Sequence, residues 1–166
     1  MRFSKSYVSG PLVINSSRTT LEIVQGAEVL MLPKVDYETA CPQKGCPFIS
    51  TSPGLHGCHT IYPNRNSPTD GYKVCLSDIT ITGEGTINGA STWDPNSWWL
   101  CARLQLNNCW RPILNHLTNV HRLTVNGSLT MKNAPTGFLR LNENIETRVS
   151  GVNFNAPYFT RNTDGI

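Results

Sequence analysis

The sequence predicts an all-β protein folded as a parallel β-helix, and three observations lead to this class. Helix signals are scarce, because no sustained 3.6-residue periodicity with flanking caps occurs along the chain. Short apolar or alternating runs recur instead, each bounded by Gly, Asn or Pro. Similar units also repeat at a spacing in the low twenties, which suits one coil of a parallel β-helix.

The strand-forming runs are evenly distributed through most of the chain. They are "LEIVQGAEVLM" at 21–31, "ITITGEGTING" at 79–89, "LTVNGSLTM" at 123–131 and "TRVSGVNFN" at 147–155. Each combines β-branched residues with internal turn residues, so each predicts short strands separated by turns.

Internal similarity supports stacked coils in the last two thirds of the chain. The tripeptide "NAP" occurs at 133–135 and again at 155–157, and an Asn followed by a β-branched residue occurs at 119–120 and at 144–145. A β-sandwich with regular hairpins is the alternative. The hairpin dipeptide "NG", at 88–89 and at 126–127, keeps that alternative open.

Residues from about 33 to 74 break the repeat. This stretch is rich in Pro and Gly and contains Cys41, Cys46 and Cys58. We expect an ordered insertion between two coils, stapled by disulfides. The 166 residues are otherwise one domain's length of chain, so we predict one β-helix domain over 1–166 that carries this insertion.

Six cysteines indicate an oxidising compartment. They are Cys41, Cys46, Cys58, Cys75, Cys101 and Cys109. An even number in and around a Pro/Gly-rich stretch predicts disulfides, whose pairing the sequence leaves open. A zinc site built from Cys41, Cys46, Cys58 and the neighbouring histidines His56 and His59 is the alternative, but no CxxC pair is present. We therefore predict no metal.

The charge is uneven. The formal net charge is +3, and residues 101–166 hold seven basic residues and three acidic ones. This balance is compatible with a polyanionic partner, either nucleic acid or an acidic polysaccharide, and equally with a mildly basic solvated surface.

Three ordered segments resemble one enzyme family. They are "SGPLVINSSRTTLEIVQGAEVLM" at 9–31, "ITITGEGTINGASTWDPNSWW" at 79–99, and "RPILNHLTNVHRLTVNGSLTMKNAPTGF" at 111–138, which leads into the final "NTDGI". Their order and spacing are similar to those of the polygalacturonases, glycoside hydrolases of family twenty-eight. The resemblance implies a right-handed parallel β-helix and hydrolysis of α-1,4 bonds between galacturonate units with inversion. It also implies that the "WW" segment is structural.

The resemblance assigns roles to residues near the end of the chain. Asp164 matches the first of three catalytic aspartates, and the resemblance implies that it is one of the carboxylates that hold and polarise the attacking water. Asn162 matches an asparagine that contacts substrate. Thr163 is expected to pack inward, and Gly165 to allow close backbone approach. No metal and no cofactor are implied.

Several family motifs have no match. The sequence has no adjacent Asp-Asp pair and no Arg-x-Lys, its nearest approach to Gly-His-Gly is the upstream "GLHG" at 54–57, and Asn88 stands where the family usually has Asp. We therefore expect the N-terminal half of such an enzyme, incomplete at both ends and inactive as an isolated chain. Glu143 and Glu146 are expected to be solvated rather than to complete the site.

The implied partner is pectin or polygalacturonate, with no nucleic acid and no membrane. The full-length enzyme would be a secreted monomer, although "MRFSKSYVSGPLVI" lacks the apolar core of a signal peptide. Three alternatives remain. They are a non-catalytic module that binds pectin or another polyanion, a purely structural β-helix, and a relative of the rhamnogalacturonan hydrolases.

Overall fold

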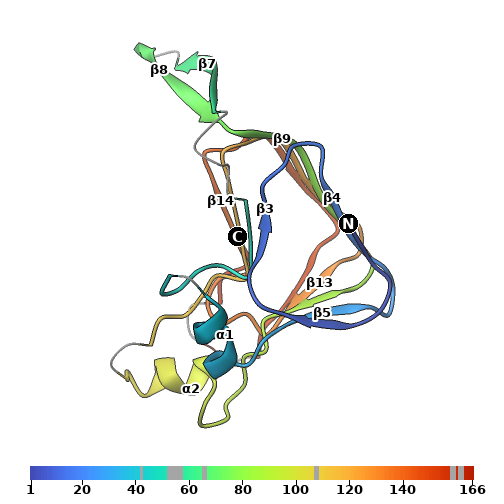
Figure 1. Ribbon diagram of the computed structural model, residues 1–166, viewed down its shortest axis with the longest axis vertical. Helices are drawn as coiled ribbons and strands as arrows, with labels where there is room; N and C mark the ends of the chain where they lie inside the picture. Colours follow the sequence, from blue (N-terminus) through green and yellow to red (C-terminus); the bar gives the residue numbers. More distant parts are fainter. Residues whose placement is uncertain (42, 52–57, 65–66, 107–108, 158–159, 161–162) are drawn as a thin grey trace.

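The computed structural model describes residues 1–166 except 42, 52–57, 65–66, 107–108, 158–159 and 161–162. Its chain winds into coils whose strands stack into three parallel sheets (Figure 1). The first sheet contains β1 (Arg2–Phe3), β4 (Thr20–Ile23), β9 (Leu76–Gly83), β12 (Val120–Val125) and β15 (Ile145–Val149). The second contains β2 (Tyr7–Ser9), β5 (Glu28–Met31), β10 (Thr86–Asn88), β13 (Thr130–Lys132) and β16 (Asn153–Asn155). The third contains β3 (Leu12–Ile14), β6 (Ile49–Thr51), β11 (Asn115–Thr118) and β14 (Leu139–Asn142).

This architecture confirms the predicted parallel β-helix and overturns the β-sandwich alternative. Every strand pair within the three sheets is parallel. The "NG" at 126–127 lies at the corner between β12 and β13, which belong to different sheets, and therefore forms no hairpin. Each of the four predicted runs forms one strand of the first sheet and one of the second, because its internal Gly or Asn turns the corner.

The coil period in the second half of the chain agrees with the predicted repeat. Leu117 pairs with Leu141, and Thr130 with Asn153. The sequence markers are displaced from this register by one residue, however, since His121 rather than Val120 pairs with Ile145. The displacement has a function in the fold, because the Asn144 side chain accepts a hydrogen bond from the Val120 N–H at 2.9 Å and donates one to the Leu117 carbonyl at 2.8 Å.

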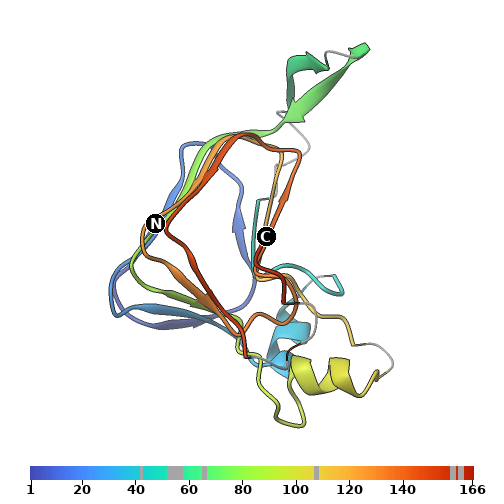
Figure 2. The same cartoon turned by 180° about the vertical axis from the view of Figure 1, so that it is seen from behind.

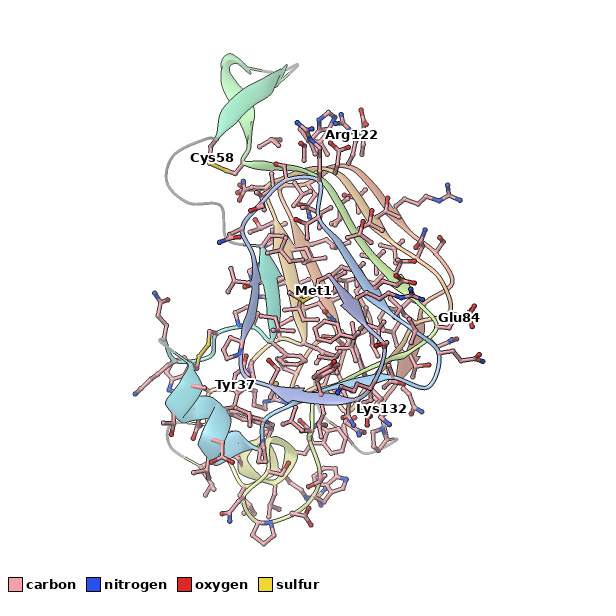
Figure 3. The ribbon with its side chains drawn as sticks, turned by 45° about the vertical axis from the view of Figure 1, so that its right-hand side comes forward. Met1, Tyr37, Cys58, Glu84, Arg122 and Lys132 are labelled. Atoms are coloured by element: carbon pink, nitrogen blue, oxygen red, sulfur yellow. A yellow bond between two sulfur atoms is a disulfide. The ribbon has the colours of Figure 1, made fainter. Side chains whose placement is uncertain are left out.

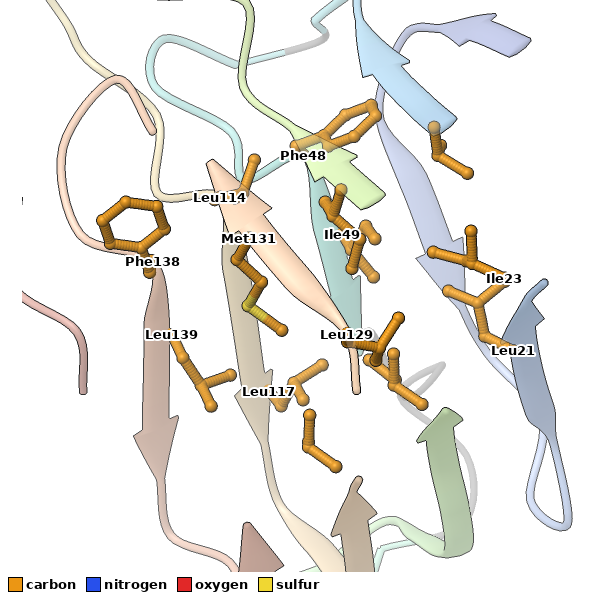
Figure 4. Close-up of a cluster of buried hydrophobic side chains, with 14 of the residues drawn as sticks. Leu21, Ile23, Phe48, Ile49, Leu114, Leu117, Leu129, Met131, Phe138 and Leu139 are labelled. Atoms are coloured by element: carbon orange, nitrogen blue, oxygen red, sulfur yellow. The ribbon is translucent and has the colours of Figure 1, made fainter. Parts of the chain in front are cut away.

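The core is a column of inward side chains that runs along the coil axis (Figure 4). In the second sheet Val29, Ile87 and Met131 stack in register and are fully buried. Each buried aliphatic side chain of this kind contributes about 1.5–3 kcal/mol from removal of apolar surface from water. Because each coil buries its apolar side chains against the next coil, strands of only a few residues are enough to build a continuous core.

The corner between the first and second sheets requires glycine. Gly83, Gly127 and Gly151 occupy it in successive coils, with φ values of 123°, 91° and 69°. A Cβ atom on Gly127 would overlap the Gly83 carbonyl oxygen, and one on Gly151 would overlap the Gly127 carbonyl oxygen. The backbones of neighbouring coils thus approach too closely at this corner for any side chain.

Three excursions project from the coils, as Figures 1 and 2 show from opposite sides. Helices α1 (Lys34–Ala40) and α2 (Trp98–Arg103) lie on connections from the second sheet to the third. The antiparallel hairpin of β7 (His59–Asn64) and β8 (Ser67–Val74) lies on a connection from the third sheet to the first. The stretch predicted as one insertion at 33–74 therefore holds two excursions, separated by β6, which pairs with β3 and β11.

The six cysteines form three disulfides, Cys41–Cys46, Cys58–Cys75 and Cys101–Cys109. The Cys58–Cys75 bond closes the base of the hairpin (Figure 3). These bonds consume the thiols of the zinc alternative, and the part of the chain that the structure describes holds no cluster of three or more metal-ligating side chains. No helix among the described residues is long and apolar enough to cross a membrane.

Trp98 and Trp99 have the structural role expected of the "WW" segment. Both are buried. Trp98 meets the Tyr37 ring edge to face, with ring centroids 6.3 Å apart, and the Trp99 Nε1–H donates to the Ala134 carbonyl at 2.9 Å. Helix α2 is thereby fixed both to α1 and to the next coil.

Candidate functional site

Asp164 lies beside the third sheet, where its backbone continues the hydrogen-bond ladder. The Phe138 N–H donates to the Asp164 carbonyl at 2.9 Å, and the Leu139 N–H donates to the Gly165 carbonyl at 3.1 Å. The same pattern joins the previous coils, where the Leu114 N–H donates to the Gly137 carbonyl at 3.0 Å. The position of Asp164 is therefore set by the register of the stack.

The Asp164 side chain is exposed, and its carboxylate makes no hydrogen bond or ion pair with any residue that the structure describes. It lies at a shallow pocket of about 270 Å³, whose lining includes Ile113, Gly137, Arg140 and Leu141. An unpaired carboxylate at an open pocket can accept a hydrogen bond from water or from a sugar hydroxyl.

Arg140 and His116 form the polar surface next to this pocket. They pair in register on β14 and β11, and alternation along the strands places both on the outer face of the third sheet. Burial, together with the positive charge of Arg140, lowers the pKa of His116. The Asn142 Nδ2 and His116 Nε2 atoms are 3.3 Å apart. The face thus offers one guanidinium and one imidazole that favours its neutral form.

The expected roles of the residues around Asp164 stay predictions, and the structure gives the surroundings of two of them. Thr163 is half-buried, and its Oγ1 lies 2.9 Å from the Thr160 Oγ1. A Cβ atom on Gly165 would come within 3.1 Å of the Phe154 ring, so glycine allows a close approach there. Asn162, the predicted substrate contact, lies outside the described residues.

The structure brings no second carboxylate to this pocket among the described residues that line it. Glu143 and Glu146 are exposed, as expected; Glu143 lies in the turn between β14 and β15, and Glu146 lies in β15 of the first sheet. Glu143 accepts a hydrogen bond from Asn119 at 2.8 Å, and Glu146 lies 3.4 Å from His121. The site therefore contains one carboxylate where an inverting glycosidase uses two.

The sequence patterns singled out neither Arg140 nor His116 as a site residue. The signal that could have found them is the coil register. Leu117 and Leu141 are inward residues in equivalent positions, so the residues that precede them, His116 and Arg140, are outward neighbours.

No protein-family model matches the sequence, and the comparison with curated proteins finds no match. Solved structures do share the fold, and the class they define is the parallel β-helix of polygalacturonases. The polygalacturonase from Erwinia carotovora ssp. carotovora matches with a TM-score of 0.70 at 20% identity, over 97% of this chain and 41% of that chain.

Two further solved structures agree. The hyperthermoactive exopolygalacturonase from Thermotoga maritima has a TM-score of 0.68 at 12% identity, over 99% of this chain and 40% of that chain. The family 28 exopolygalacturonase from Yersinia enterocolitica has a TM-score of 0.65 at 20% identity, over 99% of this chain and 34% of that chain. This chain thus spans well under two thirds of each, and at these identities the likeness establishes the fold.

Proposed function

We propose that this chain supplies part of the substrate-binding and catalytic face of a glycoside hydrolase that cleaves α-1,4-galacturonosyl bonds of pectin with inversion. The observation that carries the proposal is the placement of Asp164. Its backbone is hydrogen-bonded to Phe138 at the edge of the third sheet, and its carboxylate is exposed beside Arg140. The structural neighbours from Erwinia carotovora and Thermotoga maritima are polygalacturonases, which supports the same substrate class.

Each polar group of the site has a role in this reaction. The carboxylate of Asp164 accepts a proton from water and directs the oxygen toward the anomeric carbon. The guanidinium of Arg140 pairs with the carboxylate of a galacturonate unit, for which its planar fork is suited. Asn162, on the basis of the family resemblance, donates or accepts a hydrogen bond with a sugar hydroxyl.

Inversion needs a general acid as well as a base, separated by about 6.5–9.5 Å. Because the described pocket lining holds Asp164 as its one acid, we propose that this chain alone has little or no hydrolytic activity. The same observation favours a second candidate, a module that binds pectin without cleaving it. The three disulfides support a secreted protein, and we propose that the full-length enzyme is a monomer.

Two measurements test these proposals. Purified chain is incubated with polygalacturonate and the reducing ends are counted, and binding of the same polymer is followed by calorimetry at low and at high salt. We expect salt-sensitive binding without turnover, because the attraction between Arg140 and a polyanion is screened by ions. Clear turnover would show that the chain alone is active, and absence of binding would overturn the substrate class.

Variants of the site sharpen the test. Arg140→Ala should weaken binding several-fold, whereas Asp164→Asn should leave it unchanged or tighten it, because the variant removes a like charge. Asn162→Ala should weaken it. Glu84→Gln is the matched control, since Glu84 is also exposed but lies at the corner between the first and second sheets (Figure 3). Equal binding by Arg140→Ala and the parent would contradict the proposed site.

A further inference from the structure

Two triplets of the type Asn-x-Ser/Thr, the acceptor pattern for N-linked glycosylation, occur in the sequence, and the proposed function uses neither. They are Asn15-Ser16-Ser17 and Asn126-Gly127-Ser128. Three disulfides support folding in an oxidising secretory compartment, where this modification takes place. The two triplets have different surroundings in the fold, and these surroundings favour one of them as an acceptor.

The first triplet forms an exposed turn. It lies between β3 and β4, and all three of its residues are exposed. The Ser16 hydroxyl donates to the Asn15 Oδ1 at 3.3 Å, whereas the Asn15 Nδ2, the atom that would carry a sugar, donates to no described residue. The next coil sends the β7–β8 hairpin outward from the same corner, between the third sheet and the first (Figure 1). A bulky group at this corner therefore has room outside the coils.

The second triplet is packed into the corner between β12 and β13. The Asn126 side chain is half-buried, and its Oδ1 is enclosed without a hydrogen-bond partner among the described residues. A Cβ atom on Gly127 would overlap the Gly83 carbonyl oxygen, so the backbone of the previous coil lies directly against this turn. An amide that is enclosed on one side cannot turn freely, and a large sugar attached to it would disturb the packing of the corner.

The order of synthesis separates the two triplets further. In the folded chain the Ser17 Oγ accepts a hydrogen bond from the Ser77 N–H at 2.9 Å, across a separation of 60 residues. Because a chain grows at about 5–20 residues per second, the Ser17 hydroxyl stays free for roughly 3–12 s before Ser77 is made. In the second triplet the Ser128 N–H donates to the Gly83 carbonyl at 2.9 Å, and Gly83 precedes it in the chain. That triplet can dock as soon as it is made.

We infer that Asn15 is an N-glycosylation site and that Asn126 stays unmodified. In the transfer, the Asn15 Nδ2 forms a bond to the anomeric carbon of an oligosaccharide, whose donor is a lipid-linked sugar diphosphate. The bond between that carbon and the diphosphate oxygen breaks, the diphosphate leaves with the bonding electrons, and the Nδ2 loses one proton. The Ser17 hydroxyl is the recognition group of the acceptor. The inference rests on the proposed secretion and not on binding or cleavage of pectin.

The test is secretion of the full chain, behind a leader peptide, from a eukaryotic host. Peptide N-glycosidase in heavy-oxygen water converts each glycosylated Asn into a labelled Asp, and mass spectrometry of the peptides locates the label. We expect label at Asn15 and none at Asn126. Absence of label at Asn15 in the secreted chain overturns the site, and label at Asn126 overturns the distinction between the two triplets.

Variants of both triplets sharpen the test. Asn15→Gln and Ser17→Ala should each abolish the shift in gel mobility that the glycosidase produces, whereas Ser17→Thr keeps a hydroxyl and should retain the shift. Asn126→Gln is the matched control and should leave the shift unchanged. The shift is read in the cell lysate as well as in the medium, so a variant that fails to fold still gives a result. A shift that persists in Asn15→Gln overturns the site.

A reductant in the culture tests the argument from the order of folding. The Cys58–Cys75 disulfide directly precedes β9, the strand on which β12 and the second triplet dock. Dithiothreitol prevents this closure, so label should appear at Asn126 while the occupancy of Asn15 does not fall. No label at Asn126 under these conditions would overturn the argument that docking protects it. Binding of polygalacturonate is a separate measurement, so the glycosylation site and the proposed function can fail independently.

Discussion

Asp78 and Arg122 join two neighbouring coils by a two-pronged ion pair. The Arg122 Nε lies 2.6 Å from the Asp78 Oδ1, and the Arg122 Nη2 lies 2.8 Å from the Asp78 Oδ2. Both residues adopt positive φ, 59° for Asp78 and 60° for Arg122, and Glu146 has a φ of 56° in the next coil. A left-handed residue thus recurs at the same level in β9, β12 and β15 of the first sheet.

Removal of this pair should change how stability depends on acid. The hydrogen bond from Arg122 lowers the pKa of Asp78, despite an opposing effect of desolvation. The stabilisation is therefore present above the unfolded carboxyl pKa of about 3.9 and is lost as the pH falls below it. Arg122→Ala should make the melting temperature depend less on pH in this acidic range, whereas Arg148→Ala should leave that dependence unchanged. Because the pair is exposed, the effect should be small, and identical acid profiles would contradict it.

Gly127→Ala should destabilise the fold strongly. The residue has positive φ, and the new Cβ atom would overlap the Gly83 carbonyl oxygen. We expect a loss of about 2 kcal/mol or more in the free energy of unfolding, measured by urea denaturation. Gly26→Ala is the matched control, because Gly26 has a φ of 78° but no atom within 4 Å of the added Cβ. Gly26→Ala should lower the free energy of unfolding by only about 1 kcal/mol. Equal losses in Gly26→Ala and Gly127→Ala would show that steric contact between coils is unimportant.

Trp99→Phe should cost about 1 kcal/mol of folding free energy. The variant keeps an aromatic ring in the buried position but removes the donor to the Ala134 carbonyl. Trp93→Phe changes an exposed ring and should be neutral. Denaturation midpoints measure both, and equal midpoints for Trp99→Phe and the parent would show that this bond does not secure α2.

Arg140→Ala should raise the pKa of His116, which nuclear magnetic resonance titration measures directly. Burial and the charge of Arg140 both lower this pKa, so the variant removes one of the two causes. A histidine with a lowered folded pKa destabilises the fold on protonation, so stability is full above the unfolded value of about 6.5 and declines below it. An unchanged His116 titration in Arg140→Ala would contradict the proximity of the two side chains.

The fold could be predicted from the sequence to a large extent, because its regularity is local. The run at 79–89 shows both the β-branched residues of a strand and the glycines of a corner, and neither depends on distant contacts. Strand β6 was not recognised, because its three residues give too short a pattern and lie between a Pro-rich stretch and the hairpin. Pairing with β3 and β11 decides its conformation, and that pairing is long-range.

The site was only partly predictable. Asp164 could be singled out because it lies within an ordered series of motifs, and its catalytic role stays a prediction. Which residues surround Asp164 depends on how successive coils pair. The repeated Asn markers are displaced by one residue from that pairing, so the markers alone do not reveal which residues are neighbours. Disulfide pairing was unpredictable for a similar reason, since spacing alone permits many combinations of six cysteines.

The connections from the second sheet to the third differ widely in length without disturbing the register of the third sheet. They run from Met31 to Ile49, from Asn88 to Asn115 and from Lys132 to Leu139, yet Ile49, Asn115 and Leu139 pair in register. Loop length and coil register are therefore independent variables in this scaffold. Sequence could be grafted into these connections, or removed from them, to reshape the neighbouring surface while Asp164 keeps its place on the ladder.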